Sequence, residues 1–476
     1  MHKINLPIGI ALLALITSTH SFSATNEIEI TFEAGSGEKV AAYQGSFEVP
    51  ENRSNASSRK IPINYVRFPA TGKNAGPPIV YLSGGPGGSG IRTAKYRRFE
   101  LFMMMRQFGD VIALDQRGTG ALHTTPECKS SKRIPLDDAM SDAAYYEIHR
   151  QAMVECLTFW KNQNIDILGY TTTENVSDLD ALREHLGADK ITLWGISYGS
   201  HLALAALKQI EGRIHKVIIA SAEGLDQTIK MPFRTDDYFS RLQDAIDQQE
   251  QLSTQFPDIK ALVRRVHKNL EEAPLPVTFD KNGESITLLL QRRSMQQFAS
   301  GGISDPSRAL QLLQIYDAID HGNTEPLVGV LKRFVEPNKP ITFPAMSYAM
   351  DLASGQSEAR YQEIMRQAET SLLASHLNPT IHYTGLIPNL DLGDAFREAP
   401  ESGVPTLLFS GTLDGRTYIE SQREAVAGLK NSTLITVVNA GHNLFKSSPK
   451  ITETIERFMR DETIDNNEIV VELPLK

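Results

Sequence analysis

The sequence predicts an α/β fold, in which a mostly parallel sheet carries helices on both faces. Short apolar runs alternate with helical patterns in the first half of the chain and again near its end. Such runs are typical of parallel strands that are buried on both sides. Residues 226–400 show helical patterns with polar residues between apolar positions. We therefore predict one core in two parts, 25–225 and 401–476, interrupted by a helical cap or lid at 226–400.

The individual elements follow from the same patterns, taken in chain order. Ser177 is a candidate N-cap for the helix expected at 176–186, because Asp178 and Asp180 follow it. We expect strands at 28–32, 43–49, 61–68, 78–82, 111–114, 191–194, 217–220, 406–410 and 432–438, and helices at 142–163, 176–186, 200–207, 419–429 and 451–459.

Composition excludes several classes of protein. The 476 residues are 41% hydrophobic and 22% charged, as in ordinary globular proteins, which excludes a largely disordered chain and a polytopic membrane protein. The net charge is −9 and no stretch is rich in Lys or Arg, so we expect no nucleic-acid partner. Two cysteines are too few for a disulfide scaffold.

The first 24 residues are typical of a secretory signal peptide. Lys3 precedes an apolar run at 8–16, and small residues end the segment at Ala24. A membrane anchor is the alternative, but the run is short for a span. We predict cleavage after Ala24, export to the periplasm or the medium, and no stable membrane anchor.

Export exposes the chain to an oxidising compartment, where disulfides persist. Cys128 and Cys156 are the two cysteines, and we expect them to form a disulfide. The alternative is a pair of reduced, buried thiols. No His/Cys cluster has ligand spacing, so we expect no metal site.

The strongest chemical motif is Gly195-Ile196-Ser197-Tyr198-Gly199, which has the G-x-S-x-G pattern. It follows the expected strand 191–194 and opens the expected helix 200–207, the context of a nucleophile elbow. The serine then lies at a helix N-terminus, whose dipole favours developing negative charge. We predict Ser197 as a nucleophile; a chance glycine-rich turn is the alternative.

A serine nucleophile needs a base and a carboxylate that orients it. Asp414 follows the strand 406–410 and His442 follows the strand 432–438, so the chain order is Ser, Asp, His. Both lie where catalytic groups gather in α/β sheets. His201 is closer to the serine in sequence but lies inside the helix after the elbow, which disfavours it as the base.

The developing oxyanion needs two preorganised N–H donors. One is expected from the Tyr198 amide and the other from residues 83–90 (SGGPGGSG), with Gly85 preferred to Gly84. A phosphate cradle is the alternative for this loop, but it lacks the G-x-x-x-x-G-K-[ST] pattern.

Five motifs also carry a family resemblance: 83–90, 115–120 (DQRGTG), 194–199 (WGISYG), 410–417 (SGTLDGRT) and Gly441-His442. They resemble α/β-hydrolase serine peptidases that include prolyl and tripeptidyl aminopeptidases. Prolyl aminopeptidases usually have His and Trp where this chain has Ser83 and Tyr198, so the chain looks closer to the secreted tripeptidyl branch. The resemblance implies the triad Ser197, Asp414 and His442, a lid, and removal of residues from peptide N-termini.

An aminopeptidase must recognise a free α-ammonium, and a buried carboxylate is the natural partner. Glu223 is the first candidate because it lies just past the strand 217–220; a loop acid facing water is the alternative. Asp351 is the second candidate. Asp115 and Arg117 are expected to brace the loop near the oxyanion site.

Three functions fit the sequence. We predict a serine exopeptidase that acts on peptides with a free N-terminus through an acyl-enzyme, without metal or cofactor. An esterase or amidase acting on a small metabolite would use the same triad. A non-catalytic binding module is the third hypothesis, and the intact Ser, Asp and His disfavour it.

Overall fold

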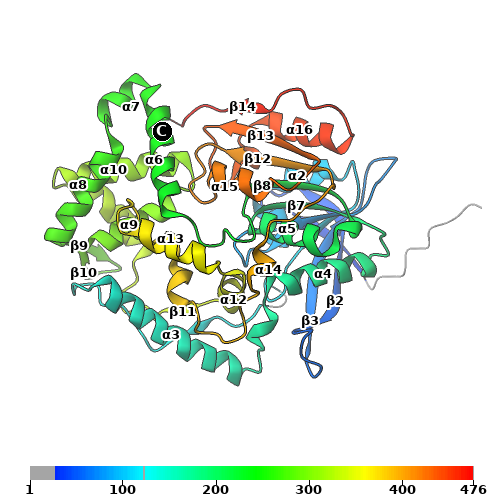
Figure 1. Cartoon of the computed structure of the whole chain (residues 1–476), viewed down its shortest axis with the longest axis horizontal. Helices are drawn as coiled ribbons and strands as arrows, with labels where there is room; N and C mark the ends of the chain where they lie inside the picture. The colour runs from blue at the N-terminus through cyan, green and yellow to red at the C-terminus, as the bar shows by residue number, and fades with distance from the viewer. Residues whose placement is uncertain (1–26, 122–123, 475–476) are drawn as a thin grey trace, which may run out of the picture.

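A ten-stranded sheet, in the right-hand half of Figure 1, forms the core of the computed structural model, which describes residues 27–121 and 124–474. The predicted signal peptide at 1–24 lies outside the described residues. The strand order is β1-β2-β3-β5-β4-β7-β8-β12-β13-β14, with antiparallel pairs from β1 to β5 and parallel pairs from β5 to β14. The strands are β1 Ile28–Glu33, β2 Lys39–Pro50, β3 Lys60–Phe68, β4 Ile79–Leu82, β5 Val111–Leu114, β7 Ile191–Ser197, β8 Ile214–Ala222, β12 Thr406–Gly411, β13 Ser432–Val438 and β14 Glu468–Val470.

Helices cover both faces of this sheet, as predicted. Alternate residues of β8 show why: Val217 and Ile219 belong to the cluster beneath α4 and α5, whereas Ile218 and Ala220 belong to the cluster beneath α1, α2 and α16. A strand buried on both sides needs apolar residues at every position. The helices of the core are α1 Gly90–Tyr96, α2 Phe99–Met105, α3 Asp142–Asn162, α4 Thr172–His185, α5 Tyr198–Ile210, α15 Ile419–Ala425 and α16 Pro449–Met459, with short 3-10 turns at Ile167–Gly169, Glu211–Arg213 and Leu444–Lys446.

One helix begins earlier than predicted. Thr171, not Ser177, caps α4, because Thr171 Oγ1 accepts the Glu174 amide at 3.3 Å. Ser177 lies inside the helix, where its hydroxyl donates back to the Thr173 carbonyl at 3.1 Å. Several side chains can satisfy a first-turn amide, and sequence alone does not rank them.

Between β8 and β12 the chain forms a mainly helical insertion, most of it at the left of Figure 1. Its first part forms a hydrophobic cluster that also includes Leu413, Tyr418 and Leu473 of the core, whereas residues 345–353 belong to the core cluster beneath α4 and α5. The division of the chain at 226 and 400 remains a proposal. The helical patterns do not predict the β-hairpin within the insertion, which β9 and β10 form. The insertion comprises α6 Pro232–Asp247, α7 Glu250–Gln255, α8 Ile259–Glu272, β9 Leu275–Lys281, β10 Glu284–Leu290, α9 Arg292–Gly302, α10 Pro306–Asp320, α11 Glu325–Phe334, β11 Thr342–Phe343, α12 Ala345–Ser354, α13 Glu358–Ala368, the 3-10 turn η3 Pro379–Tyr383 and α14 Asp394–Arg397.

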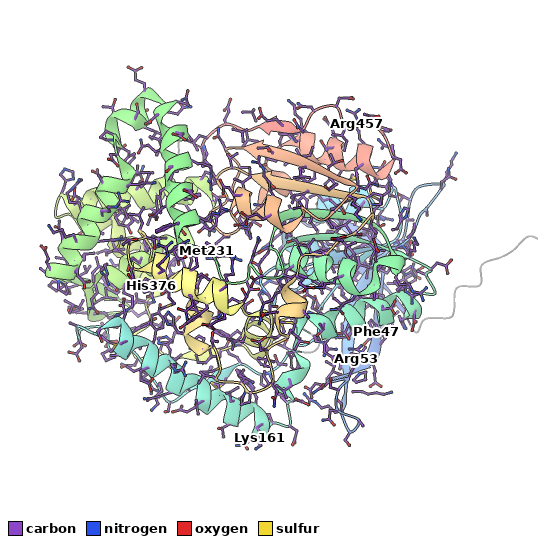
Figure 2. All side chains as sticks on the ribbon, in the orientation of Figure 1. Phe47, Arg53, Lys161, Met231, His376 and Arg457 are labelled. Atoms are coloured by element: carbon purple, nitrogen blue, oxygen red, sulfur yellow. A yellow bond between two sulfur atoms is a disulfide. The ribbon has the colours of Figure 1, made fainter. Side chains whose placement is uncertain are left out.

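The segment before the elbow packs on the insertion as well as on the core. The short strand β6 Cys128–Lys129 pairs with β11 of the insertion, and Tyr146 of α3 bonds the ring of His376 at 2.8 Å. Figure 2 shows His376 within the helical part of the molecule. The predicted disulfide is confirmed: Cys128 and Cys156 are bonded, with Cα atoms 5.5 Å apart.

Candidate active site

The expected nucleophile lies in a strained turn between β7 and α5. Ser197 has φ 56° and ψ −128°, a conformation that residues other than glycine rarely adopt. A Cβ atom on Gly199 would lie 2.1 Å from the Leu82 carbonyl oxygen, and one on Gly195 would lie 2.6 Å from the Gly199 carbonyl oxygen. The turn therefore requires glycine on both sides of the serine, which accounts for the motif.

His442 and Asp414 form a hydrogen-bonded pair at the adjacent strand ends. His442 Nδ1 lies 3.0 Å from both carboxylate oxygens of Asp414, whose side chain is fully buried. The Asp414 oxygens also accept the amides of Arg416 at 2.8 Å and Thr417 at 2.9 Å. Burial raises the pKa of Asp414, but the His442 charge and these N–H donors outweigh burial and hold that pKa below its usual value. The ionised carboxylate thus orients the imidazole and leaves Nε2 for a hydroxyl.

Sheet register brings this pair to the serine. Ser197 lies opposite Ala222 of β8, and the neighbouring Ser221 donates its hydroxyl to the His442 carbonyl at 2.8 Å. Within residues 27–121 and 124–474, no hydrogen bond joins Ser197 Oγ to the His442 ring. In unliganded enzymes such bonds are often long and tighten when substrate binds.

A turn of the insertion packs directly against the loops that carry Asp414 and His442, a feature that sequence reasoning missed. The His442 amide donates to the Ser304 carbonyl at 2.9 Å. A Cβ on Gly415 would lie 2.2 Å from the Ile303 carbonyl oxygen, and one on Gly441 would lie 2.8 Å from the Ser304 carbonyl oxygen. We call residues 303–305, between α9 and α10, the wedge turn.

The glycine-rich loop after β4 approaches the serine closely. A Cβ on Gly84 would lie 2.9 Å from the Ile196 carbonyl oxygen and 3.1 Å from Ser197 Cβ. Gly85 has a φ of 131°, a backbone conformation that only glycine adopts at low energetic cost. The Tyr198 amide lies in the first turn of α5, which leaves it without an intrahelical acceptor. These positions agree with an oxyanion hole formed by Gly85 and Tyr198, which remains a proposal.

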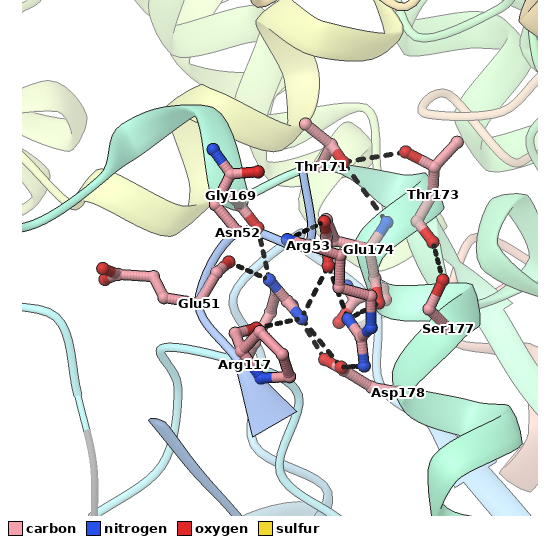
Figure 3. A network of polar contacts seen from close by, with 12 residues as sticks. Glu51, Asn52, Arg53, Arg117, Gly169, Thr171, Thr173, Glu174, Ser177 and Asp178 are labelled. Atoms are coloured by element: carbon pink, nitrogen blue, oxygen red, sulfur yellow. Dashed lines mark hydrogen bonds and ion pairs between the residues drawn. The ribbon is translucent and has the colours of Figure 1, made fainter. Parts of the chain in front are cut away.

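Asp115 braces this loop, as expected, but Arg117 does not. Asp115 Oδ1 accepts the Ser89 hydroxyl at 2.6 Å and the Ile91 amide at 3.2 Å. Arg117 turns instead toward α4, where its guanidinium bonds both oxygens of Asp178 at 2.7 Å (Figure 3). A fully buried guanidinium needs anionic partners, and α4 supplies them.

The two acidic candidates have different surroundings. Glu223 forms an ion pair with Lys230, and its backbone amide donates to Ser200 Oγ, which in turn donates to the Ser197 carbonyl at 2.5 Å. Asp351 makes no ion pair among the described residues. Burial and the nearby Glu223 charge raise the pKa of Asp351 to about 8, against the smaller opposing charges of Lys230 and Arg416.

Helix α12, which carries Asp351, contacts both α5 and the glycine-rich loop. The sulfur of Met350 lies 3.2 Å from the Tyr198 hydroxyl. A Cβ on Gly87 would lie 2.4 Å from Ser347 Oγ, so this helix also contacts the glycine-rich loop. Ser347 and Asp351 are four residues apart and share one face of α12.

His201, which the sequence disfavours as the base, is buried in α5. Its ring bonds the Gly224 carbonyl and the Ser354 hydroxyl, each at 3.1 Å.

No group of three or more His, Cys, Asp or Glu side chains in the described part of the chain is arranged to hold a metal ion. The same residues include no helix that is long and apolar enough to cross a membrane.

Comparison with known proteins places this geometry in context. The family model described as "alpha/beta hydrolase fold" matches residues 77–449. The serine protease Hip1 of Mycobacterium bovis is 29% identical over 38% of this chain and 36% of its own length. The tripeptidyl aminopeptidase of Streptomyces lividans is 26% identical over 30% and 28%, and the proline iminopeptidase of Xanthomonas citri is 28% identical over 32% and 34%. The matches span about a third of each relative.

Proposed function

This chain belongs to the alpha/beta hydrolase fold family, and on that premise we propose that it is an exported serine exopeptidase that acts on peptides with a free N-terminus. The observation that carries the catalytic part is the buried Asp414 carboxylate bonded to His442 beside the strained Ser197. Relatives named as peptidases support a peptide substrate. The Cys128–Cys156 disulfide supports export, because disulfides persist in oxidising compartments.

The proposed mechanism is acyl transfer. His442 takes the proton of Ser197 as the serine oxygen attacks the scissile carbonyl, and the amides of Gly85 and Tyr198 hold the oxyanion. His442 then gives that proton to the departing amine, which leaves an acyl-enzyme. Water, deprotonated by His442, releases the acyl fragment with a new carboxyl group.

Amine recognition is the part that makes this an aminopeptidase. We assign it to the acidic pair Glu223 and Asp351, of which Lys230 already neutralises Glu223. Of these two carboxylates, Asp351 makes no ion pair with any described residue, so a substrate ammonium would ionise it and become its partner. These surroundings favour Asp351, the second sequence candidate, over Glu223 for direct contact with the amine.

Paired peptides test this function. One peptide has a free N-terminus and its twin is N-acetylated; products are read by mass spectrometry, with Ser197→Ala as the inactive control. Trimming of only the free peptide is expected, and the product masses give the number of residues removed. Equal cleavage of both peptides would refute amine recognition.

An esterase or amidase acting on a small metabolite is the second candidate, because the same triad serves it. If neither peptide is cut while a fluorophosphonate still labels Ser197, this candidate replaces the first. Absence of labelling in a folded protein would instead favour a non-catalytic binding module.

A further inference from the structure

Two hollows adjoin near α12, one of them between α3 of the core and the insertion and the other within the insertion. One is a cleft of about 600 Å³ and the other a cavity of about 250 Å³. Gln356, Thr384 and Asp391 line both hollows, so the two meet at these residues, which we call the junction. Across it, Gln356 Nε2 donates to Thr384 Oγ1 at 3.4 Å. This long side-chain hydrogen bond therefore lies where the two spaces meet.

Helix α12 lies between the cavity and the glycine-rich loop. Asp351 lines the cavity, and Ser347, one turn earlier on the same helix face, lies against Gly87 of the glycine-rich loop. In the proposed function, the substrate amine meets Asp351 while its scissile carbonyl meets Ser197. The fragment to be released therefore has its amine toward the cavity, and the remaining peptide lies on the opposite side of Ser197.

The cleft beyond the junction has an acidic lining. Its walls contain four carboxylates and two arginines. Arg397 is already paired with Asp391 and Asp394, and Arg150 donates to the His382 carbonyl at 2.6 Å. Within the described residues, Glu147 and Glu358 make no ion pair. The free negative charge favours a cationic occupant.

We propose that the cavity, junction and cleft form the release channel for the N-terminal fragment, while the trimmed peptide leaves from the other side of Ser197. This inference rests on the proposed function. Hydrolysis leaves the fragment with its ammonium already at the cavity, and the acidic cleft attracts that ammonium outward through the junction. The new carboxylate follows last, from the site where the acyl-enzyme formed.

Pre-steady-state kinetics of Thr384→Trp test the channel. Thr384 is exposed, so the indole can be accommodated while it narrows the junction. The substrates are aminoacyl, dipeptidyl and tripeptidyl amides of a fluorescent amine, each with a free N-terminus. We expect an unchanged first turnover and a steady-state rate about tenfold lower, because fragment release becomes rate-limiting. The loss should grow with the size of the fragment.

Matched variants keep the test decisive. Thr278→Trp is the control, since Thr278 is also exposed and also bonds a side-chain hydroxyl, that of Thr287, far from the cleft in the β9–β10 hairpin. Gln356→Trp repeats the test if Thr384→Trp fails to fold. Equal slowing of first and later turnovers, or no slowing, would overturn the channel. A wild-type enzyme that trims none of these substrates would instead refute the proposed function.

Discussion

At the scale of single residues, the Asp414–His442 pair has the clearest consequence. Asp414→Asn keeps the side-chain shape but removes the charge that fixes the tautomer and orientation of the imidazole. We expect kcat to fall by about 10⁴-fold, with much less effect on KM, because the lost interaction matters most in the transition state. Steady-state kinetics on the substrate identified by the paired digests provide the measurement.

Arg416→Gln serves as the matched control, because Arg416 reaches Asp414 through its backbone amide, which the substitution keeps. Its kcat should stay within a few-fold of wild type. A comparable collapse in both variants would show that loop folding, not the carboxylate, is responsible.

The raised pKa of Asp351 makes stability depend on pH. That pKa is about 8 in the folded protein against an ordinary 3.8, so between these values the folded state holds a proton that the unfolded chain has lost. The free energy of unfolding therefore falls as pH rises across this window. Asp351→Asn removes the effect, and we expect its Tm to exceed that of wild type by a few degrees at pH 8.5 and to match it near pH 4.

Thermal unfolding at the two pH values checks this prediction. Asp280→Asn, at an exposed hairpin position, should show no such pH-dependent difference. The same offset at both pH values would contradict the role of ionisation. The Asp351→Asn variant should also bind amine-bearing peptides less tightly, which would exemplify stability given up for function.

At the scale of elements, Arg117 joins three segments of the core. Its guanidinium bonds Asp178 of α4 and the carbonyls of Glu51 and Gly169, and it is fully buried (Figure 3). Removing it leaves buried carboxylates with less compensation, which costs about 3–5 kcal/mol. We expect Arg117→Ala to lower the urea midpoint of unfolding markedly.

Arg366→Ala is the comparison for that measurement. Arg366 pairs with Glu363 on the exposed face of α13, and such pairs contribute little. Its midpoint should be unchanged. Similar midpoints for the two variants would mean that the Arg117 cluster does not stabilise the fold.

The elements that sequence predicts well are those with local signals. Strands such as β5 are continuous apolar runs, and the elbow is recognisable because its glycines are sterically required. The β9–β10 hairpin and the packing of the wedge turn against Gly415 and Gly441 depend on contacts between distant segments. No local pattern encodes such contacts.

The acidic candidates for amine recognition show the same limit for single side chains, whose partners can come from distant segments. Glu223 has the right place after β8, but its partner Lys230 comes from the loop that leads into the insertion. Likewise, we predict from sequence that Arg117 braces the glycine-rich loop. The Arg117 side chain points instead to the carboxylates of α4, which lie near it only in the folded protein.

At the scale of the whole molecule, the disulfide cross-links two parts of the core segment that packs on the insertion. Cys128 lies in β6, which pairs with β11 of the insertion, and Cys156 lies in α3. Replacing both by serine removes a cross-link that typically contributes about 2–4 kcal/mol. We expect a lower Tm with the triad kept, measured by thermal unfolding and by fluorophosphonate labelling of Ser197 at low temperature. Loss of labelling at low temperature would contradict this expectation.

The wedge turn means that the insertion is not an interchangeable module. If the insertion moved away from the core as a rigid body, Ser304 would move with it and the hydrogen bond from the His442 amide to the Ser304 carbonyl would break. Chimeras that graft the insertion of another hydrolase onto this core would therefore need a matching backbone carbonyl at that point. The insertion thus helps to hold His442, the proposed catalytic base, so the position of His442 depends on whether the insertion is docked on the core.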